Sequence, residues 1–146
     1  MIFRLHHIGY AVREIASAAE EYVARFGYQV TTPAIHDPFQ TAHVQFLRLP
    51  GDQAYLEFVA PDGPESKLAG AIKRGSKLNH LCYMTPQLED AVAHLERQDV
   101  RQISEFRPGV AFSGRRLCWL LGPDGVPIEL VEQESLDDPC EPGLMR

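Results

Sequence analysis

The stretch Leu5-His6-His7-Ile8-Gly9-Tyr10-Ala11-Val12 decides the fold, because its pattern returns later as Leu78-Asn79-His80-Leu81-Cys82-Tyr83-Met84-Thr85. Both stretches read Leu-x-His-aliphatic-x-Tyr and are rich in residues that favour strands. A pattern that recurs within one chain indicates two copies of one structural unit. The chain is therefore predicted to consist of two similar modules.

An amphipathic helix is predicted after each of these strands. Apolar residues recur there at the spacing of one helix face: Ile15, Ala18, Ala19, Tyr22, Val23 and Phe26 in the first copy, and Leu88, Ala91, Val92 and Leu95 in the second. Gly27 stands where the first helix is expected to end. Pro86 is tolerated at the start of the second helix.

Strands are predicted to follow each helix. The clearest are residues 42–47 and 55–59 in the first module and residues 116–121 and 128–131 in the second, joined by turns at Pro50-Gly51-Asp52 and Gly122-Pro123-Asp124-Gly125. One further strand is expected before each pair, near residues 29–32 and 101–105. Each module is thus predicted to have the order β-α-β-β-β.

The whole chain, residues 1–146, is predicted to form one α+β domain. Module one spans about residues 3–61 and module two about residues 77–133. The linker between them, residues 62–76, is expected to hold a short helix from Lys67 to Arg74 that Ser66 caps and Gly75 ends. The tail, residues 134–146, has little apolar content and is expected to lie on the surface.

Two glutamates indicate a metal site. Glu57 and Glu129 each lie inside an otherwise apolar strand, where an ionised carboxylate is costly unless it is paired or bound to a cation. A histidine precedes each at nearly the same distance, because His7 lies 50 residues before Glu57 and His80 lies 49 residues before Glu129. Imidazole and carboxylate together suit Zn, Co, Ni, Mn or Fe. Pseudo-twofold pairing of the modules would bring all four side chains to one divalent ion, whose identity the sequence does not fix.

His6 is the alternative ligand on the first strand. A shift of one residue points a strand side chain to the opposite face, and His7 is the residue that aligns with His80. Cys82 and Met84 alternate with His80 and are expected to share its face as packing residues. The three cysteines are an odd number at wide spacings, which speaks against a disulfide framework or a four-thiolate zinc site.

Composition narrows the classes of partner. With 45% hydrophobic and 23% charged residues the chain is ordinary for a globular protein. The net charge is −6 and no run of Lys or Arg is present, so a nucleic-acid partner is not expected. No segment approaches the roughly 20 apolar residues of a membrane span, and the first residues lack the apolar stretch of a signal peptide. A cytoplasmic protein without a membrane partner is therefore predicted.

With these motifs the chain resembles the vicinal oxygen chelate superfamily, and within it the methylmalonyl-CoA epimerase and glyoxalase I branch. The resemblance covers nearly all of residues 3–133 and is strongest in four segments: residues 5–12, residues 56–68 with Leu-Glu-Phe-Val-Ala-Pro, residues 78–81, and residues 122–132 with Gly-Pro-Asp-Gly-Val-Pro-Ile-Glu-Leu-Val-Glu. Family members place metal ligands at the positions of His7, Glu57, His80 and Glu129. The resemblance implies two tandem βαβββ modules that form a curved mixed sheet around a central metal site.

The resemblance also implies an activity, that of a metal-dependent isomerase or lyase similar to methylmalonyl-CoA epimerase. The metal would bind two neighbouring oxygens of a small carbonyl acid or thioester and stabilise an enolate while a base removes a proton. Glu129 is the first candidate for that base, and Glu57 is its counterpart on the other face. Two alternatives remain open: glyoxalase I (lactoylglutathione lyase) activity, and a non-enzymatic small-molecule-binding or resistance protein. The four ligand-type residues argue against the binding protein. A ring-cleaving dioxygenase is disfavoured, because such relatives use two histidines and one glutamate on a larger chain.

The chain departs from the family pattern on the strand at residues 42–47. Some epimerases carry another acidic residue there, whereas this chain offers only His43 or Gln45 as a substitute. The loop at residues 107–116 lies where relatives cover their site, so Arg115 and Arg116 either meet a carboxylate or phosphate of the substrate or form a solvated turn. No segment identifies a CoA or glutathione pocket. A homodimer is expected, because the family often dimerises and the modules expose strand edges.

Overall fold

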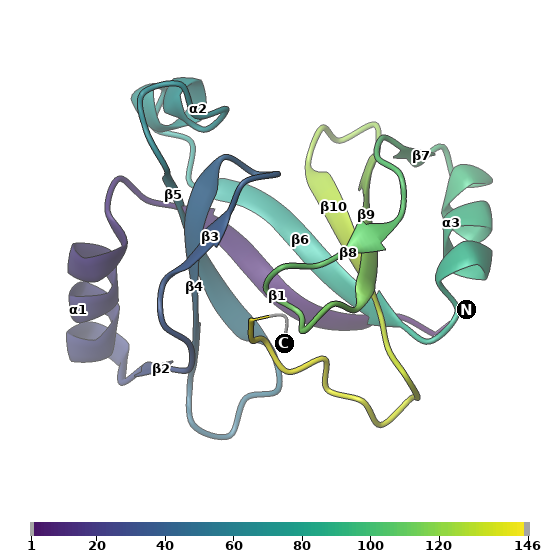
Figure 1. Ribbon diagram of the computed structural model, residues 1–146, viewed down its shortest axis with the longest axis horizontal. Helices are drawn as coiled ribbons and strands as arrows, with labels where there is room; N and C mark the ends of the chain where they lie inside the picture. Colours follow the sequence, from purple (N-terminus) through teal and green to yellow (C-terminus); the bar gives the residue numbers. More distant parts are fainter. Residues whose placement is uncertain (1, 145–146) are drawn as a thin grey trace. The chain divides into compact units, whose positions relative to one another are not determined.

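The computed structural model describes residues 2–144, and these residues form ten strands and three helices (Figure 1). In chain order they are β1 (Arg4–Ala11), α1 (Ile15–Phe26), β2 (Gln29–Val30), β3 (Ile35–Asp37), β4 (Ala42–Arg48), β5 (Tyr55–Pro61), α2 (Ala69–Lys73), β6 (Leu78–Thr85), α3 (Leu88–Glu96), β7 (Arg101–Gln102), β8 (Arg107–Pro108), β9 (Arg116–Leu121) and β10 (Pro127–Glu132). The chain separates into two compact units. The first unit runs from His7 to Asn79, and the second contains the residues up to His6 and from His80 onward.

The first unit is built on a mixed sheet with the strand order β2-β4-β5-β1, and β3 pairs with β4. β4 and β5 are antiparallel, whereas β1 runs parallel to β5. Helix α1 packs against one face of this sheet, where its Ala19 joins a core with Leu47, Phe58 and Ala60. The predicted helix is confirmed, including its end, because Gly27 adopts a left-handed φ of 80° and its N–H donates to the carbonyl oxygen of Val23.

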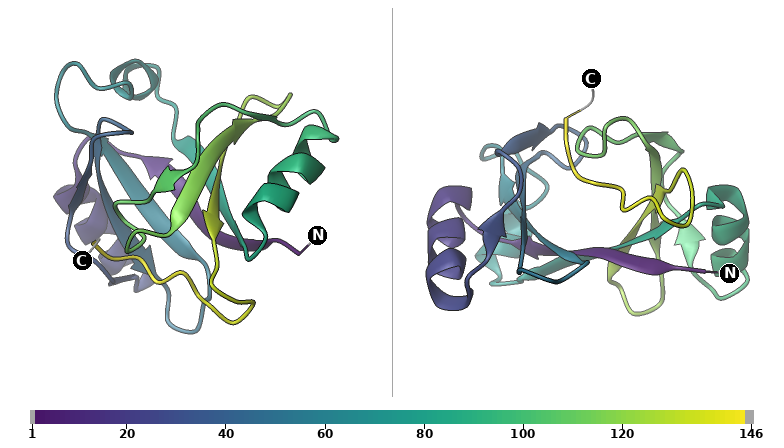
Figure 2. Two further views of the ribbon diagram at one scale, coloured as in Figure 1. Left: turned by 45° about the vertical axis from the view of Figure 1, so that its right-hand side comes forward. Right: turned by 90° about the horizontal axis from the view of Figure 1, so that it is seen from below.

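The second unit repeats this arrangement with the strand order β6-β10-β9-β7, and β8 pairs with β9. Its parallel pair is β6 with β10, and its antiparallel pair is β10 with β9. Helix α3 packs against one face through a core formed by Leu88, Ala91, Val92, Cys118, Leu120 and Leu130. Figure 2 shows in each unit how the helix lies against the sheet of its own unit. The duplication and the α+β class predicted from the sequence are confirmed.

The strands predicted at residues 29–32 and 101–105 are shorter than expected, and both end for the same reason. The N–H of Phe46 donates to the hydroxyl of Thr32 over 3.2 Å, and the N–H of Trp119 donates to the hydroxyl of Ser104 over 2.8 Å. A side-chain hydroxyl thus takes the place of the backbone carbonyl in each ladder, and regular pairing stops. The short strands β3 and β8, which the sequence analysis did not predict, follow these points.

The linker holds a shorter helix than residues 67–74. Residues 66–68 form a turn in which the hydroxyl of Ser66 accepts the N–H of Leu68 and donates to the carbonyl of Thr41, so α2 begins at Ala69. Gly75 follows the helix with a φ of 78°. No helix among residues 2–144 is long and apolar enough to cross a membrane.

The tail after β10 combines exposed positions with three buried residues, Gln133, Cys140 and Pro142. The carboxylate of Asp138 organises it by accepting the N–H groups of Glu134 and Cys140, each over 2.9 Å. Gly143 forms a β-bridge with Phe112. The sequence did not predict these contacts, and the last two residues of the predicted tail lie outside the described residues.

Candidate functional site

His7 and Glu57 lie together on the face of the first sheet that is opposite to α1. β1 and β5 run side by side with Gly9 opposite Glu57, so the alternation of the strands places His7 and Glu57 on one face. The Nε2 atom of His7 is 3.5 Å from Oε1 of Glu57, and the side chains are only 0% and 2% exposed. Gly9, the register partner of Glu57, lies on the same face two residues after His7. It has no side chain to fill the space beside the carboxylate.

His80 and Glu129 repeat this pair in the second unit. β6 and β10 are parallel with Cys82 opposite Glu129, and Nε2 of His80 lies 3.7 Å from Oε1 of Glu129. The two side chains are 0% and 3% exposed. Cys82 and Met84 alternate with His80 along β6 and are buried, in agreement with their predicted packing role.

An aromatic ring completes each pair. Phe46 is the register partner of Glu57, and its ring stands edge-on to His7 with centroids 5.2 Å apart at an interplanar angle of 85°. Trp119 is the partner of Glu129 and stands edge-on to His80 at 4.8 Å and 73°. We call His7, Glu57 and Phe46 half-site one, and His80, Glu129 and Trp119 half-site two. The sequence analysis missed the two rings, although each lies ten or eleven residues before its glutamate.

The spacing within each half-site fits two ligands of one metal ion. An ordinary N–H···O hydrogen bond spans about 2.7–3.2 Å, and both His–Glu distances are longer than that. Two ligand atoms each about 2.1 Å from an ion in tetrahedral geometry stand about 3.4 Å apart, close to the observed 3.5 and 3.7 Å. A neutral imidazole nitrogen and a carboxylate oxygen are also the donors that Zn, Fe, Ni and Mn accept in proteins. Each half-site therefore fits part of a divalent metal site.

His6 does not take the place of His7. It points to the other face of β1, where its Nε2 donates to the carbonyl oxygen of Cys140 over 2.9 Å. Its ring also stands edge-on to Phe112 with centroids 5.1 Å apart. His6 thus fixes the tail against the N-terminal strand, and His7 is the histidine beside Glu57.

The substitutes considered for a further acidic residue lie on the wrong face of β4. His43 pairs with Ala60 and Gln45 with Phe58, so both point to the side of the sheet that carries α1. On the Glu57 face β4 presents the fully buried apolar residues Ala42, Val44 and Phe46 and, at its end, the half-buried Arg48, so no carboxylate of β4 lies there. Neither His43 nor Gln45 can replace a carboxylate beside Glu57.

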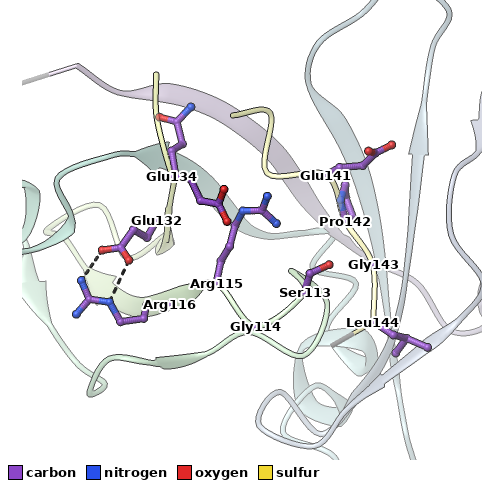
Figure 3. A pocket seen from close by; sticks show the side chains of 11 residues that line it. Ser113, Gly114, Arg115, Arg116, Glu132, Glu134, Glu141, Pro142, Gly143 and Leu144 are labelled. Atoms are coloured by element: carbon purple, nitrogen blue, oxygen red, sulfur yellow. Dashed lines mark hydrogen bonds and ion pairs between the residues drawn. The ribbon is translucent and has the colours of Figure 1, made fainter. Parts of the chain in front are cut away.

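Arg115 and Arg116 are held by carboxylates of the chain itself. Arg115 donates through Nε and Nη2 to Asp138, each over 2.9 Å. Arg116 makes a bidentate contact with Glu132 and a 2.7 Å contact with Glu89. Both arginines line an open groove of about 750 Å³ formed by residues 113–116, 132–134 and 141–144, shown in Figure 3. Because Glu132, Glu134 and Glu141 also line it, this groove is not a preformed phosphate site.

Arg115 helps to lower the pKa of Asp138 in the tail. Burial alone would raise the pKa of Asp138, but the hydrogen bonds from Arg115 and from the N–H groups of Glu134 and Cys140 outweigh it and hold that pKa below its usual value. The thiols behave in the opposite way, because burial raises the pKa of Cys118 and of Cys140 to about 12. All three cysteines are buried and form no disulfide among the described residues.

The comparisons with known proteins agree with this architecture. The sequence model of the Glyoxalase/Bleomycin resistance protein/Dioxygenase superfamily matches residues 6–119. This match covers well over half of the chain, and the protein belongs to that superfamily.

Its relatives include epimerases. The chain is 28% identical over 134 residues to the ethylmalonyl-CoA/methylmalonyl-CoA epimerase of Cereibacter sphaeroides, covering 89% of this chain and 98% of that enzyme. The crystal structure of methylmalonyl-CoA epimerase from Mycobacterium tuberculosis is similar with a TM-score of 0.75 at 28% identity, covering 88% of this chain and 86% of that one. A methylmalonyl-CoA epimerase solved with methylmalonyl-CoA and NH4+ shares the fold with a TM-score of 0.75 at 23% identity, over 94% and 98% of the two chains.

Proposed function

We propose that this protein is a metal-dependent isomerase that removes the proton next to the carbonyl of a CoA thioester, in the manner of a methylmalonyl-CoA epimerase. The observation that carries the proposal is the recurrence of a buried His–Glu pair at the same register position of both modules. The similarity to methylmalonyl-CoA epimerases supports a CoA thioester as the substrate. Glyoxalase I chemistry has no comparable support among these relatives.

His7, Glu57, His80 and Glu129 are proposed to hold one divalent ion. Buried carboxylates of this kind are costly without a counter-charge, and a metal ion supplies it. The matched geometry of the half-sites supports equal roles for the two pairs. When bound, the ion supplies Lewis-acid stabilisation to the negative charge that develops on the substrate carbonyl.

Glu129 is proposed to accept the proton from the carbon next to that carbonyl, with Glu57 as its counterpart for return of a proton. Among the described sheet residues of the first unit, Glu57 is the only carboxylate on its face of β1, β4 and β5. The absence of a carboxylate from this face of β4 supports Glu57 and Glu129 as the two groups that transfer the proton. Phe46 and Trp119 keep water from one side of each carboxylate through their packing on the histidines.

Solvent deuterium incorporation tests this function. The metal-loaded protein is incubated with methylmalonyl-CoA in D2O, and the deuterium content of the thioester is followed by mass spectrometry. We expect one deuterium at the carbon between the two carbonyl groups, and a loss of about 10²-fold or more in exchange rate for Glu129→Gln. Glu134→Gln is the matched control, because Glu134 is an exposed glutamate of the tail, and it should exchange like the wild type.

Two results would overturn the proposal. One is exchange no faster than without protein while the hemithioacetal of methylglyoxal and glutathione is converted, which would indicate glyoxalase I activity. The other is equal exchange in the wild type and in Glu129→Gln, which would remove the proposed base.

A further inference from the structure

Two histidines of the first unit face each other across neighbouring strands. His36 of β3 and His43 of β4 are direct register partners in the antiparallel ladder. Their rings lie with centroids 5.1 Å apart at an interplanar angle of 43°. Both side chains are exposed to solvent, and Figure 1 shows their strands lying next to each other in the first unit. The ladder therefore holds two imidazoles together on an open surface.

A carboxylate orients one of the two rings. Nε2 of His36 donates to Oδ2 of Asp62 over 2.9 Å, and Asp62 is itself fixed by its N–H, which donates to the carbonyl of Thr41. In the neutral ring that a metal ligand requires, donation from Nε2 leaves the lone pair on Nδ1 of His36. A histidine whose second nitrogen donates to a carboxylate is the usual arrangement of a metal ligand in proteins.

We propose that His36 and His43 bind a divalent transition-metal ion at a surface site separate from the four residues of the proposed function. An imidazole ligand places its ring centroid about 3.2 Å from the ion, so two rings at a tetrahedral angle have centroids about 5.2 Å apart. The observed separation of 5.1 Å matches this value without movement of either strand. Water completes the coordination on the exposed side.

The site is separate from half-site one because it lies on the other face of the sheet. His43 pairs with Ala60, which belongs to the core under α1, whereas His7 and Glu57 lie on the opposite face. Metal binding by His36 and His43 is therefore independent of His7 and Glu57. Two imidazoles suit Zn²⁺, Cu²⁺ and Ni²⁺, whereas Mg²⁺ and Ca²⁺ prefer oxygen ligands.

Equilibrium dialysis of the full chain tests the site. The protein is stripped with a chelator, dialysed against increasing Zn²⁺ and analysed for bound zinc per chain. We expect a weakly bound ion whose affinity falls at least about tenfold in His36→Ala and in His43→Ala, and about tenfold in Asp62→Asn, which removes only the orienting charge. Excess Mg²⁺ should not displace it.

His94→Ala is the matched control, because His94 is a histidine of α3 in the other unit. It should bind zinc like the wild type. Unchanged zinc affinity in both the His36→Ala and His43→Ala variants, or an equal loss in His94→Ala, would overturn the proposal. Glu57→Gln separates this site from the proposed function, since it should leave the weakly bound ion in place whether or not a tightly bound ion exists.

Discussion

Phe46 and Trp119 make the two half-sites alike beyond their His–Glu pairs. Each is the cross-strand partner of the glutamate and meets the histidine edge-on. Edge-to-face contacts of this kind add about 0.5–1.5 kcal/mol to the gain from burial and restrict how the ring can turn. The aromatic residue therefore restricts the orientation of the imidazole ring beside each glutamate.

Replacing Phe46 by Ala is expected to lower the free energy of unfolding by about 3–5 kcal/mol, because the ring is fully buried and its loss leaves a cavity. Urea denaturation followed by circular dichroism measures this value. Phe26→Ala is the matched control, since Phe26 is 59% exposed at the end of α1 and should cost less than about 1 kcal/mol. Similar losses in the two variants would contradict the placement of Phe46.

At the residue scale the sequence could predict which histidine and glutamate pair in each module, but not which residues surround them. Glu57 and Glu129 stood out because a charge inside an apolar strand needs an explanation. Phe46 and Trp119 did not, because an aromatic residue is ordinary in a strand and only the register shows which residue lies opposite each glutamate. From the sequence, His43 and Gln45 both remained possible substitutes for the further acidic residue of some epimerases. The register places both on the face opposite to Glu57 and so excludes them from that role.

At the scale of the element, the ends of the strands show how closely the modules correspond. β2 ends two residues before Thr32, whose hydroxyl accepts the N–H of Phe46. β7 ends two residues before Ser104, whose hydroxyl accepts the N–H of Trp119. Sequence patterns could not predict this, because Ser and Thr occur in strands and in loops. The end of α1 was easier to predict. The apolar helix pattern stops at Phe26, and the next residue, Gly27, tolerates the left-handed backbone that ends many helices.

Gly27→Ala is expected to destabilise the protein by about 1–2 kcal/mol, because an alanine must adopt the left-handed φ of 80° that ends α1. The matched control is Gly63→Ala in the linker turn. Nothing lies within 4 Å of a Cβ at either position, and only Gly27 of the two has a positive φ. Gly63→Ala should be neutral or stabilise by up to about 1 kcal/mol. Thermal unfolding compares the two, and an equal loss of stability would contradict the role of the backbone at Gly27.

The sequence left the role of Arg115 and Arg116 in the loop at residues 107–116 undecided, because it does not show which residues these arginines contact. Asp138 lies 23 residues after Arg115, and Glu132 lies 16 residues after Arg116. Pairing over such separations is decided by how the tail and β10 fold back, which no local pattern shows. The structure assigns both arginines to these internal pairs.

At the scale of the whole molecule, the repeat in the sequence was the most informative feature. It predicted the order of the elements in both units except for the short strands β3 and β8, and the two strand orders correspond position by position. The superfamily and the similarity to methylmalonyl-CoA epimerases agree with the resemblance read from the motifs. The substrate was harder to predict, because no motif in the chain marks a CoA pocket and the groove beside Arg115 and Arg116 is lined by glutamates.

The central claim is that half-site one and half-site two serve one metal ion. The most direct measurement is the number and affinity of tightly bound Zn²⁺ ions per chain in the wild type, in Glu57→Gln and in Glu129→Gln, made in a His36→Ala background so that the surface pair does not contribute. We predict one ion per chain, whose affinity falls at least about tenfold in each variant because both carboxylates bind it. Two tightly bound ions of which each variant loses only one, or no tightly bound ion in the wild type, would contradict the claim.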